Sequence, residues 1–121
     1  MPARTLTTFA GLRVDTIELV FEGARLTKVI VMLSDQYYEA LLRQLADRFG
    51  PGEDRSFRAR AGMSGELMAG VYLWRIDAVR LVLEQFAGKI DRSSLVYGTD
   101  AALADLVREK TSYPPGTRRD L

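Results

Sequence analysis

The segment from residue 55 to residue 60 carries the side chains with the clearest capacity for recognition. Three guanidinium groups surround one aromatic ring there, at Arg55, Phe57, Arg58 and Arg60. Such an arrangement can hold a carboxylate on a partner protein or the backbone of single-stranded nucleic acid. Acidic residues at positions 53, 54 and 66 neutralise the same segment, which argues against a phosphate backbone. The segment is therefore either a solvated loop, which is the commoner outcome, or a loop that binds a protein.

Tyr72 and Trp74 make a second candidate contact. Trp74 is the only tryptophan of the chain, and large aromatic side chains often anchor a partner. The spacing of these two residues within an apolar strand favours packing, either in the core or against a second subunit. The candidate partner-binding residues are thus Arg55, Phe57, Arg58, Arg60, Tyr72 and Trp74.

Catalytic and metal-binding chemistry finds little support in the residue types present. The chain contains neither histidine nor cysteine, which removes the usual general base near neutral pH, most zinc ligands, thiolate nucleophiles and disulfides. Ser93, Ser94 and Ser112 would need a lysine base, and no Ser-x-x-Lys spacing occurs. We therefore predict a protein with no catalytic residues, no metal ligands and no cofactor, and not an enzyme.

Composition and charge describe an ordinary globular domain. With 121 residues, of which 47% are hydrophobic, the chain is long enough to bury a core as a single domain. Seventeen basic and 16 acidic residues give a net charge of +1, so no general field attracts nucleic acid. No apolar run is long enough to cross a bilayer. Residues 1–8 lack the apolar centre of a leader peptide, so we expect a cytoplasmic protein or, the favoured alternative, a periplasmic one whose leader was removed.

Hydrophobic periodicity places a β-hairpin and a helix in the first half of the chain. Apolar residues alternate over 14–22 and fill 25–33, with a Gly-Ala turn between the two segments. A helix is predicted over 35–49, since Ser34 suits its N-cap and a Gly-Pro pair follows it. Its predicted buried side consists of Tyr38, Leu41, Leu42, Leu45 and Phe49.

The second half is predicted to contain three strands and a second helix. Glycine, proline and charged residues make 50–66 a long loop, within which a short edge strand near 56–61 with Phe57 pointing inward is an alternative. The remaining predicted elements are strands over 67–76, 79–86 and 93–98, a helix over about 100–110 capped by Thr99 or Asp100, a lead-in at 1–11 and an extended, exposed tail at 111–121. Short reversals between strands imply antiparallel pairing. The predicted fold is α+β, with an antiparallel sheet of about five strands in the order β-β-α-β-β-β-α and helices packed on the sheet.

Both faces of the sheet centre are predicted to be covered. Strands 25–33 and 67–76 carry apolar residues on both sides of the backbone, whereas a sheet with one solvated face alternates apolar with polar residues. The first helix can cover one face. The other face needs the second helix, the long loop or a second subunit, for which Met32, Tyr72 and Trp74 would be the interface residues.

A series of packing and turn positions follows a pattern known from other chains. The positions are a strand ending in Phe21, a turn from Gly23 to Leu26, a helix with Tyr38 and paired leucines closed by Phe49-Gly50-Pro51, then Trp74 and Leu95-Val96-Tyr97. In this outline the chain resembles small uncharacterised bacterial exported or lipoprotein-like domains. The resemblance covers the larger part of the chain and implies an α+β fold and an envelope location. It carries over no catalytic residue, and the second helix and the basic tail depart from it.

The function predicted from these features is recognition of another protein. We predict a non-enzymatic protein-binding module, such as an inhibitor or an immunity-type protein of the bacterial envelope. One alternative is a small-ligand carrier or enzyme with a pocket between sheet and helix, lined by Tyr37 or Tyr38, Tyr72 and Trp74. A structural homodimer module is the other alternative.

Overall fold

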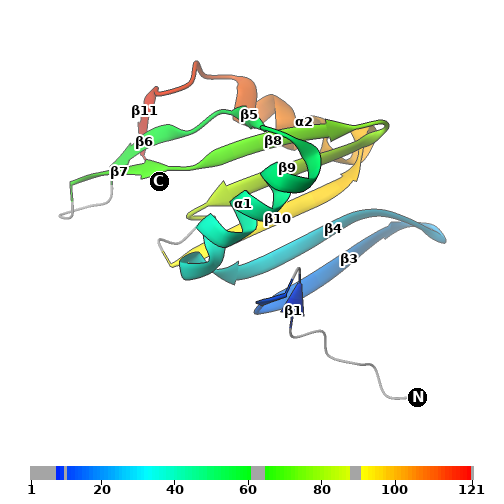
Figure 1. Ribbon diagram of the computed structural model, residues 1–121. Coiled ribbons are helices and arrows are strands. Elements are labelled where there is room, and N and C mark those ends of the chain that lie inside the picture. Colours follow the sequence, from blue (N-terminus) through cyan, green and yellow to red (C-terminus); the bar gives the residue numbers. More distant parts are fainter. Residues whose placement is uncertain (1–7, 10, 61–64, 88–90, 121) are drawn as a thin grey trace.

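The main structural element of the protein is an antiparallel β-sheet. The computed structural model describes residues 8–9, 11–60, 65–87 and 91–120 (Figure 1). These residues form a main sheet with the spatial order β3 (Thr16–Glu22), β4 (Arg25–Ser34), β10 (Arg92–Thr99), β9 (Val79–Gln85), β8 (Val71–Ile76) and β5 (Glu53–Asp54). Every neighbouring pair in this sheet is antiparallel. The predicted α+β class with an antiparallel sheet is therefore confirmed, and the main sheet has six strands where about five were expected.

The hairpin of β3 and β4 departs from regular pairing at one point. Val20 pairs with Lys28 and Phe21 with Leu26, so Thr27 is an extra residue on β4. The Thr27 hydroxyl donates to the carbonyl oxygen of Val20, 3.3 Å away. Since the extra residue of this bulge lies on β4, the distortion affects β4 and leaves β3 regular.

Helix α1 covers one face of the main sheet. After a 3-10 turn, η1 (Asp35–Tyr37), α1 (Tyr38–Phe49) continues to Gly50, whose φ of +85° favours glycine and ends the helix. The buried residues of α1 are Tyr38, Leu41 and Leu45. The predicted helix over 35–49 is confirmed in position. Within the described residues, however, the Ser34 side chain makes no capping hydrogen bond, because the element opens with a 3-10 turn and not with an α-helical one.

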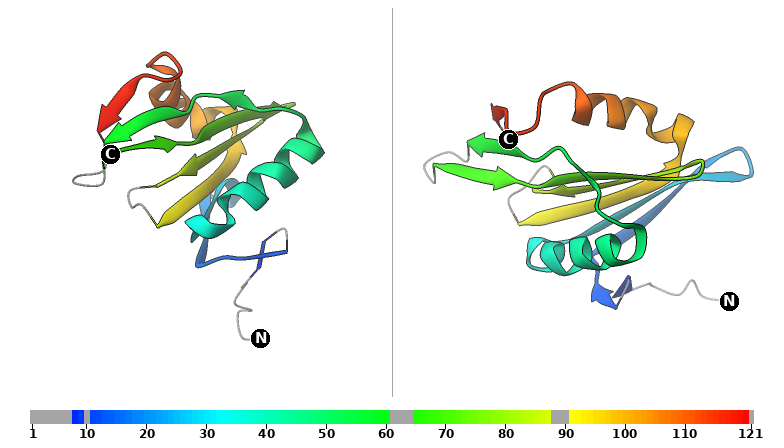
Figure 2. Two further views of the ribbon diagram at one scale, coloured as in Figure 1. Left: turned by 60° about the vertical axis from the view of Figure 1, so that its left-hand side comes forward. Right: turned by 45° about the horizontal axis from the view of Figure 1, so that its top comes forward.

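Helix α2 (Asp100–Thr111) lies on the opposite face. The Thr99 hydroxyl accepts a hydrogen bond from the amide of Ala102 at 3.1 Å, which confirms Thr99 as the predicted cap. The buried residues of α2 are Leu103, which is fully buried, and Lys110. The right-hand view of Figure 2 shows the sheet nearly edge-on between the two helices. The prediction that both faces are covered is confirmed, and the second helix provides the second cover.

Two apolar cores result, one on each face. The α1-side core includes Val31, Leu33, Leu41, Leu83 and Leu95. The α2-side core includes Phe57, Val71, Leu73, Val82 and Leu103. Successive residues of a strand point to opposite faces, which is why β8 can supply Trp74 to one core and Leu73 to the other.

A second, smaller sheet corrects the predicted loop at 50–66 and the predicted exposed tail at 111–121. Its order is β11 (Arg118–Asp120), β6 (Phe57–Arg60) and β7 (Glu66–Ala69), with β11 parallel and β7 antiparallel to β6. The alternative strand near 56–61 is thus confirmed, and Phe57 is buried as expected. The strand β6 is, however, the middle strand of the small sheet and not the predicted edge strand. The amide of Arg58 donates to the carbonyl oxygen of Thr117 at 3.2 Å, which draws the tail into the fold.

Two further boundaries differ from the predictions. The predicted strand over 67–76 is divided at Gly70 into β7 and β8, because the Gly70 amide donates to the side chain of Gln85 and its carbonyl accepts from the Gln85 amide. The predicted lead-in over 1–11 contains β1 (Thr8–Phe9), which pairs with β2 (Leu12–Arg13). Residues 1–7 and 10 of that lead-in lie outside the described residues.

Candidate functional site

The predicted partner-binding residues lie in different settings and do not share one surface. Phe57 and Trp74 are buried in opposite cores, and the Trp74 indole Nε1 donates to the carbonyl oxygen of Gly50 at 2.8 Å. Their burial corrects the expectation that these two rings contact a partner, because strand alternation points each of them toward a core. Tyr72 is half-buried, with its ring centroid 6.2 Å from that of Trp74.

The three arginines of the predicted site also separate. Arg55 forms an ion pair with Glu53 and donates to the carbonyl oxygen of Tyr113, 3.4 Å away. Arg58 and Arg60 alternate with buried residues along β6, and both are exposed on the outer face of the small sheet. Arg55 therefore serves contacts within the fold, whereas Arg58 and Arg60 remain accessible.

The space assigned to a pocket beside Tyr38 is filled by its own ring. Tyr38 is buried, and its hydroxyl has no hydrogen-bond partner within the described part of the chain. A Cβ atom at Gly70 would lie 2.1 Å from this hydroxyl. The absence of a side chain at Gly70 is therefore what leaves room for the Tyr38 ring against the sheet.

We expect Tyr38→Phe to leave the fold intact and to reduce the loss of stability at alkaline pH. Burial, and then the nearby Tyr72, raises the pKa of Tyr38 above its ordinary value of 10.0. A raised pKa in the folded state means that stability is complete below about pH 10 and falls as the pH rises above it, since the unfolded chain ionises first. Removing an unpaired buried hydroxyl should also stabilise the protein by up to about 1 kcal/mol at neutral pH.

Urea unfolding at neutral pH and at alkaline pH measures both effects of this substitution. Tyr113→Phe is the control, since Tyr113 is exposed. An alkaline loss of stability that is the same in Tyr38→Phe as in the unmodified protein would contradict this assignment.

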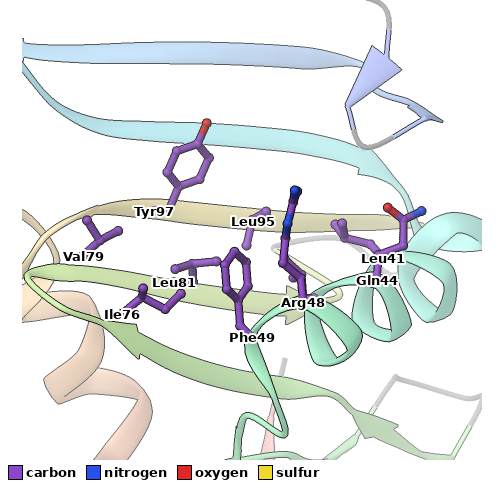
Figure 3. Close-up of a pocket in the computed structure, with 10 residues that line it drawn as sticks. Leu41, Gln44, Arg48, Phe49, Ile76, Val79, Leu81, Leu95 and Tyr97 are labelled. Atoms are coloured by element: carbon purple, nitrogen blue, oxygen red, sulfur yellow. The ribbon is translucent and has the colours of Figure 1, made fainter.

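An apolar groove of about 450 Å³ lies on the α1 side of the main sheet. It is lined by Leu41, Gln44, Leu45, Arg48, Phe49, Ile76, Val79, Leu81, Leu95 and Tyr97. The second half of α1 forms its wall, and β8, β9 and β10 form its floor (Figure 3). In that view Phe49 reaches from the end of α1 toward the strands, and Tyr97 projects from β10 on the side nearer β4. The groove shares the predicted location between sheet and helix but not the predicted lining by Tyr38, Tyr72 and Trp74.

The floor of the groove belongs to a row of apolar residues that crosses five strands. The row runs Leu19, Val29, Tyr97, Leu81 and Trp74, from β3 through β4, β10 and β9 to β8. Directly opposite residues of antiparallel strands share one face, so the row is continuous. Trp74, Leu81 and Val29 are buried, whereas Leu19 at the β3 end is 53% exposed. The helix thus covers the β8 end of the row and leaves the β3 end open.

Large apolar side chains are exposed around the groove. Phe49 and Val79 at its rim are each 40% exposed. At the open end of the row, Leu19, Phe21 and Leu26 are 53%, 53% and 44% exposed, and we call these three residues the hairpin strip. The expected burial of Phe49 is wrong, because this last residue of α1 lies where the helix leaves the sheet.

Arg48 supplies a cation at the edge of the groove. Its side chain is exposed, and none of the ion pairs formed by the described residues includes it. The neighbouring Gln44 adds an amide to the same wall. A cation in the last turn also interacts favourably with the helix dipole. Arg48 can therefore bind a carboxylate at the groove without breaking an existing ion pair.

Comparison of the chain with protein-family models, with curated proteins and with solved structures gives no match. In the part of the chain that the structure describes, neither helix is long and apolar enough to span a membrane. Over the same residues, no group of three or more carboxylates could hold a metal ion.

The residues of the groove were not predicted as a site. The cross-strand register decides that Val79 and Tyr97 lie on the same face of the sheet as α1. The alternation of apolar residues within a single strand does not reveal this register. One signal was available, the Arg48-Phe49 pair directly before Gly50. An aromatic ring in the last turn of a helix has no further helical turn beside it to shield it from solvent.

Proposed function

We propose that the protein is a non-enzymatic module that binds another protein through the groove beside α1. One observation supports this proposal most strongly. An apolar groove opens beside five large exposed apolar side chains on the same side of the sheet, namely Leu19, Phe21, Leu26, Phe49 and Val79. Exposed apolar side chains gathered beside a groove are typical of a surface that another molecule covers.

The groove and the hairpin strip together suit a protein better than a small molecule. A small molecule that filled the groove would leave the hairpin strip in water. A protein segment lying along the row from Tyr97 to Leu19 would cover both. Its complementary chemistry is an apolar side chain inserted beside Phe49 and Tyr97 and a carboxylate placed against Arg48.

The finer role that we propose is that of an inhibitor or an immunity-type protein of the bacterial envelope. The small size of the chain suits a protein that acts by covering a surface of its partner. The resemblance to small exported bacterial domains supports the envelope location. Arg58 and Arg60, exposed on the small sheet, are proposed as a separate polar contact.

A small-ligand carrier is the second candidate, and the size of the groove favours it. Its volume of about 450 Å³ lies within the roughly 300–1,000 Å³ typical of small-molecule sites. An apolar molecule with one acidic group would match the lining and Arg48. Such a ligand would be released on denaturing the purified protein and would be identified by mass spectrometry.

Photo-cross-linking in the native organism tests the protein-binding function. With p-benzoylphenylalanine at position 49 or 79, we expect protein adducts of the same discrete mass, because both positions lie on the groove rim. Met68 is also exposed but lies on the small sheet, so position 68 is the matched control and should give no such adduct. Identical adducts from all three positions, or none from 49 and 79, would contradict the proposal.

The purified cross-linked partner then permits a measurement of affinity. Phe49→Asp is expected to weaken binding about tenfold or more, since it buries a carboxylate in an apolar contact. Met68→Asp should bind like the unmodified protein in the same calorimetric titration. Equal affinities for the two variants would show that the partner binds elsewhere.

A further inference from the structure

Strand β3 leaves one edge of the main sheet open. It is the terminal strand of the order β3-β4-β10-β9-β8-β5, and no strand of the described ranges pairs along its outer side. It spans seven residues, Thr16–Glu22. An edge strand directs alternate N–H and C=O groups outward, where another strand can bind them.

The edge protection of β3 is limited to two carboxylates, those of Glu18 and Glu22. Proteins protect edge strands with charged side chains, especially lysine, with proline, a bulge or extreme shortness, or with a covering helix or loop. β3 contains neither proline nor lysine, and the bulge of its hairpin has the extra residue, Thr27, on β4. The opposite edge of the sheet is β5, which has two residues, both acidic. Of these two edges, β3 is therefore the one that offers a long template.

The sequence of β3 is complementary to itself in one antiparallel register. When Leu19 lies opposite Leu19 of a second copy, all seven residues of the strand overlap. Ile17 then lies opposite Phe21, so the apolar faces of the two strands are on the same side. Apolar and aromatic pairs of this kind stabilise antiparallel strands.

Charge favours the same register. With Leu19 at the centre, Glu18 lies opposite Val20 and Glu22 opposite Thr16, so no carboxylate faces another. A shift of the centre by one residue in either direction places Glu18 opposite Glu22 or opposite Glu18 of the other copy. Like charges directly opposite each other destabilise a strand pair. The register with the longest overlap is therefore also the one without this repulsion.

We propose that β3 pairs with β3 of a second copy of this chain in this register, which joins the two main sheets across a two-fold axis. The pairing closes both open edges at once and places the two hairpin strips side by side on one face. Because β5 is too short to act as a template, the contact produces a closed dimer and not a filament. This inference does not rest on the proposed function, because it depends on the free edge of β3. Leu19 and Phe21 nevertheless belong both to this strand and to the surface proposed to bind a partner.

Single cysteines test the register, because the native chain has no cysteine. Leu19→Cys places two thiols on directly opposed residues, whose Cα atoms are about 4.5–5.5 Å apart and within reach of a disulfide. Phe21→Cys is the matched control, since Phe21 and Leu19 are both 53% exposed. In the proposed register two cysteines at position 21 lie about 13 Å apart along the strands, too far to join. Under mild oxidation we expect a covalent dimer from Leu19→Cys in most molecules and from Phe21→Cys in few.

Light scattering on the unmodified protein gives an independent measurement. The expected mass is twice the 13.5 kDa of the chain. Leu19→Lys should reduce it to that of one chain, because two ammonium groups would then face each other. Met68→Lys, similarly exposed on the small sheet, should remain dimeric. A single-chain mass for the unmodified protein at every concentration, or equal cross-linking from positions 19 and 21, would overturn the proposal.

Discussion

Replacing Gly98 by alanine is expected to lower the free energy of unfolding by about 2–4 kcal/mol, because the new methyl group would overlap backbone atoms. A Cβ atom at Gly98 would lie 2.2 Å from the carbonyl oxygen of Thr27 and 3.0 Å from the Cα atom of Lys28. Neither atom can swing away as the end of a side chain could. The strands β4 and β10 would have to separate where the bulge at Thr27 brings them close.

Urea unfolding measures the effect of Gly98→Ala. Gly116→Ala is the control, since a Cβ atom there meets nothing within 4 Å and the cost comes only from a φ of +81°. That control should lose about 1 kcal/mol. If Gly98→Ala were as stable as the unmodified protein, the close approach of β10 to the bulge would be excluded.

The second large effect is expected from Glu84→Ala, which removes the partner of a buried cation. Lys110 has 8% of its side chain exposed, and its Nζ lies 2.6 Å from Oε1 of Glu84. Without that carboxylate the ammonium group stays buried with Glu109, 3.6 Å away and largely exposed, as its remaining carboxylate contact. We expect a loss of about 2–4 kcal/mol, toward the lower part of the range for broken buried pairs because Glu84 is itself partly exposed.

A double variant separates the cost of leaving the Lys110 charge unpaired from the cost of lost packing. Glu84→Leu combined with Lys110→Met should be within about 1 kcal/mol of the unmodified protein, because no buried charge then remains unpaired. Asp105→Ala is the control, since it breaks an exposed pair with Arg108 and should cost less than about 1 kcal/mol. A double variant as unstable as Glu84→Ala would show that the loss comes from packing.

The elements predicted correctly are those whose signals are local in sequence. Apolar alternation and a Gly-Ala turn suffice for the hairpin of β3 and β4. The stripe of Leu103, Leu106 and Val107 and the cap at Thr99 suffice for α2. Residues that are apolar on both sides of β4 and β8 also indicated two covered faces, because a solvated face would carry polar residues.

The pairing of β6 with β11 could not be predicted because the two strands are distant in sequence. The strand β6 has four residues and is rich in arginine, and its parallel neighbour β11 follows a Pro-Pro pair. The residue pattern within either strand does not reveal the other strand as its neighbour. Their parallel pairing depends on α2, which carries the chain back across the sheet (Figure 1).

The candidate site was predicted only in part for a related reason. The sequence pattern predicts large aromatic residues as partner contacts, yet Phe57 and Trp74 are buried in the two cores. Phe49 is exposed because it ends α1, and Leu19 is exposed because α1 lies over β8, β9 and β10 and not over β3. The part of a sheet that a helix covers depends on where the helix lies on that sheet. No residue pattern within the helix or within a strand predicts this position.

The parallel pairing of β6 with β11 is expected to form later during folding than the pairing of β6 with β7. Arg58 pairs with Arg118, sixty positions later in the chain, and such distant contacts form slowly because a long loop must close first. While a ribosome is still making that interval, β6 can join β7 but has nothing on its other side. A nascent chain therefore exposes the free edge of β6 until β11 has been made, and slower translation of the interval between these two strands would lengthen that exposure to chaperones or to aggregation.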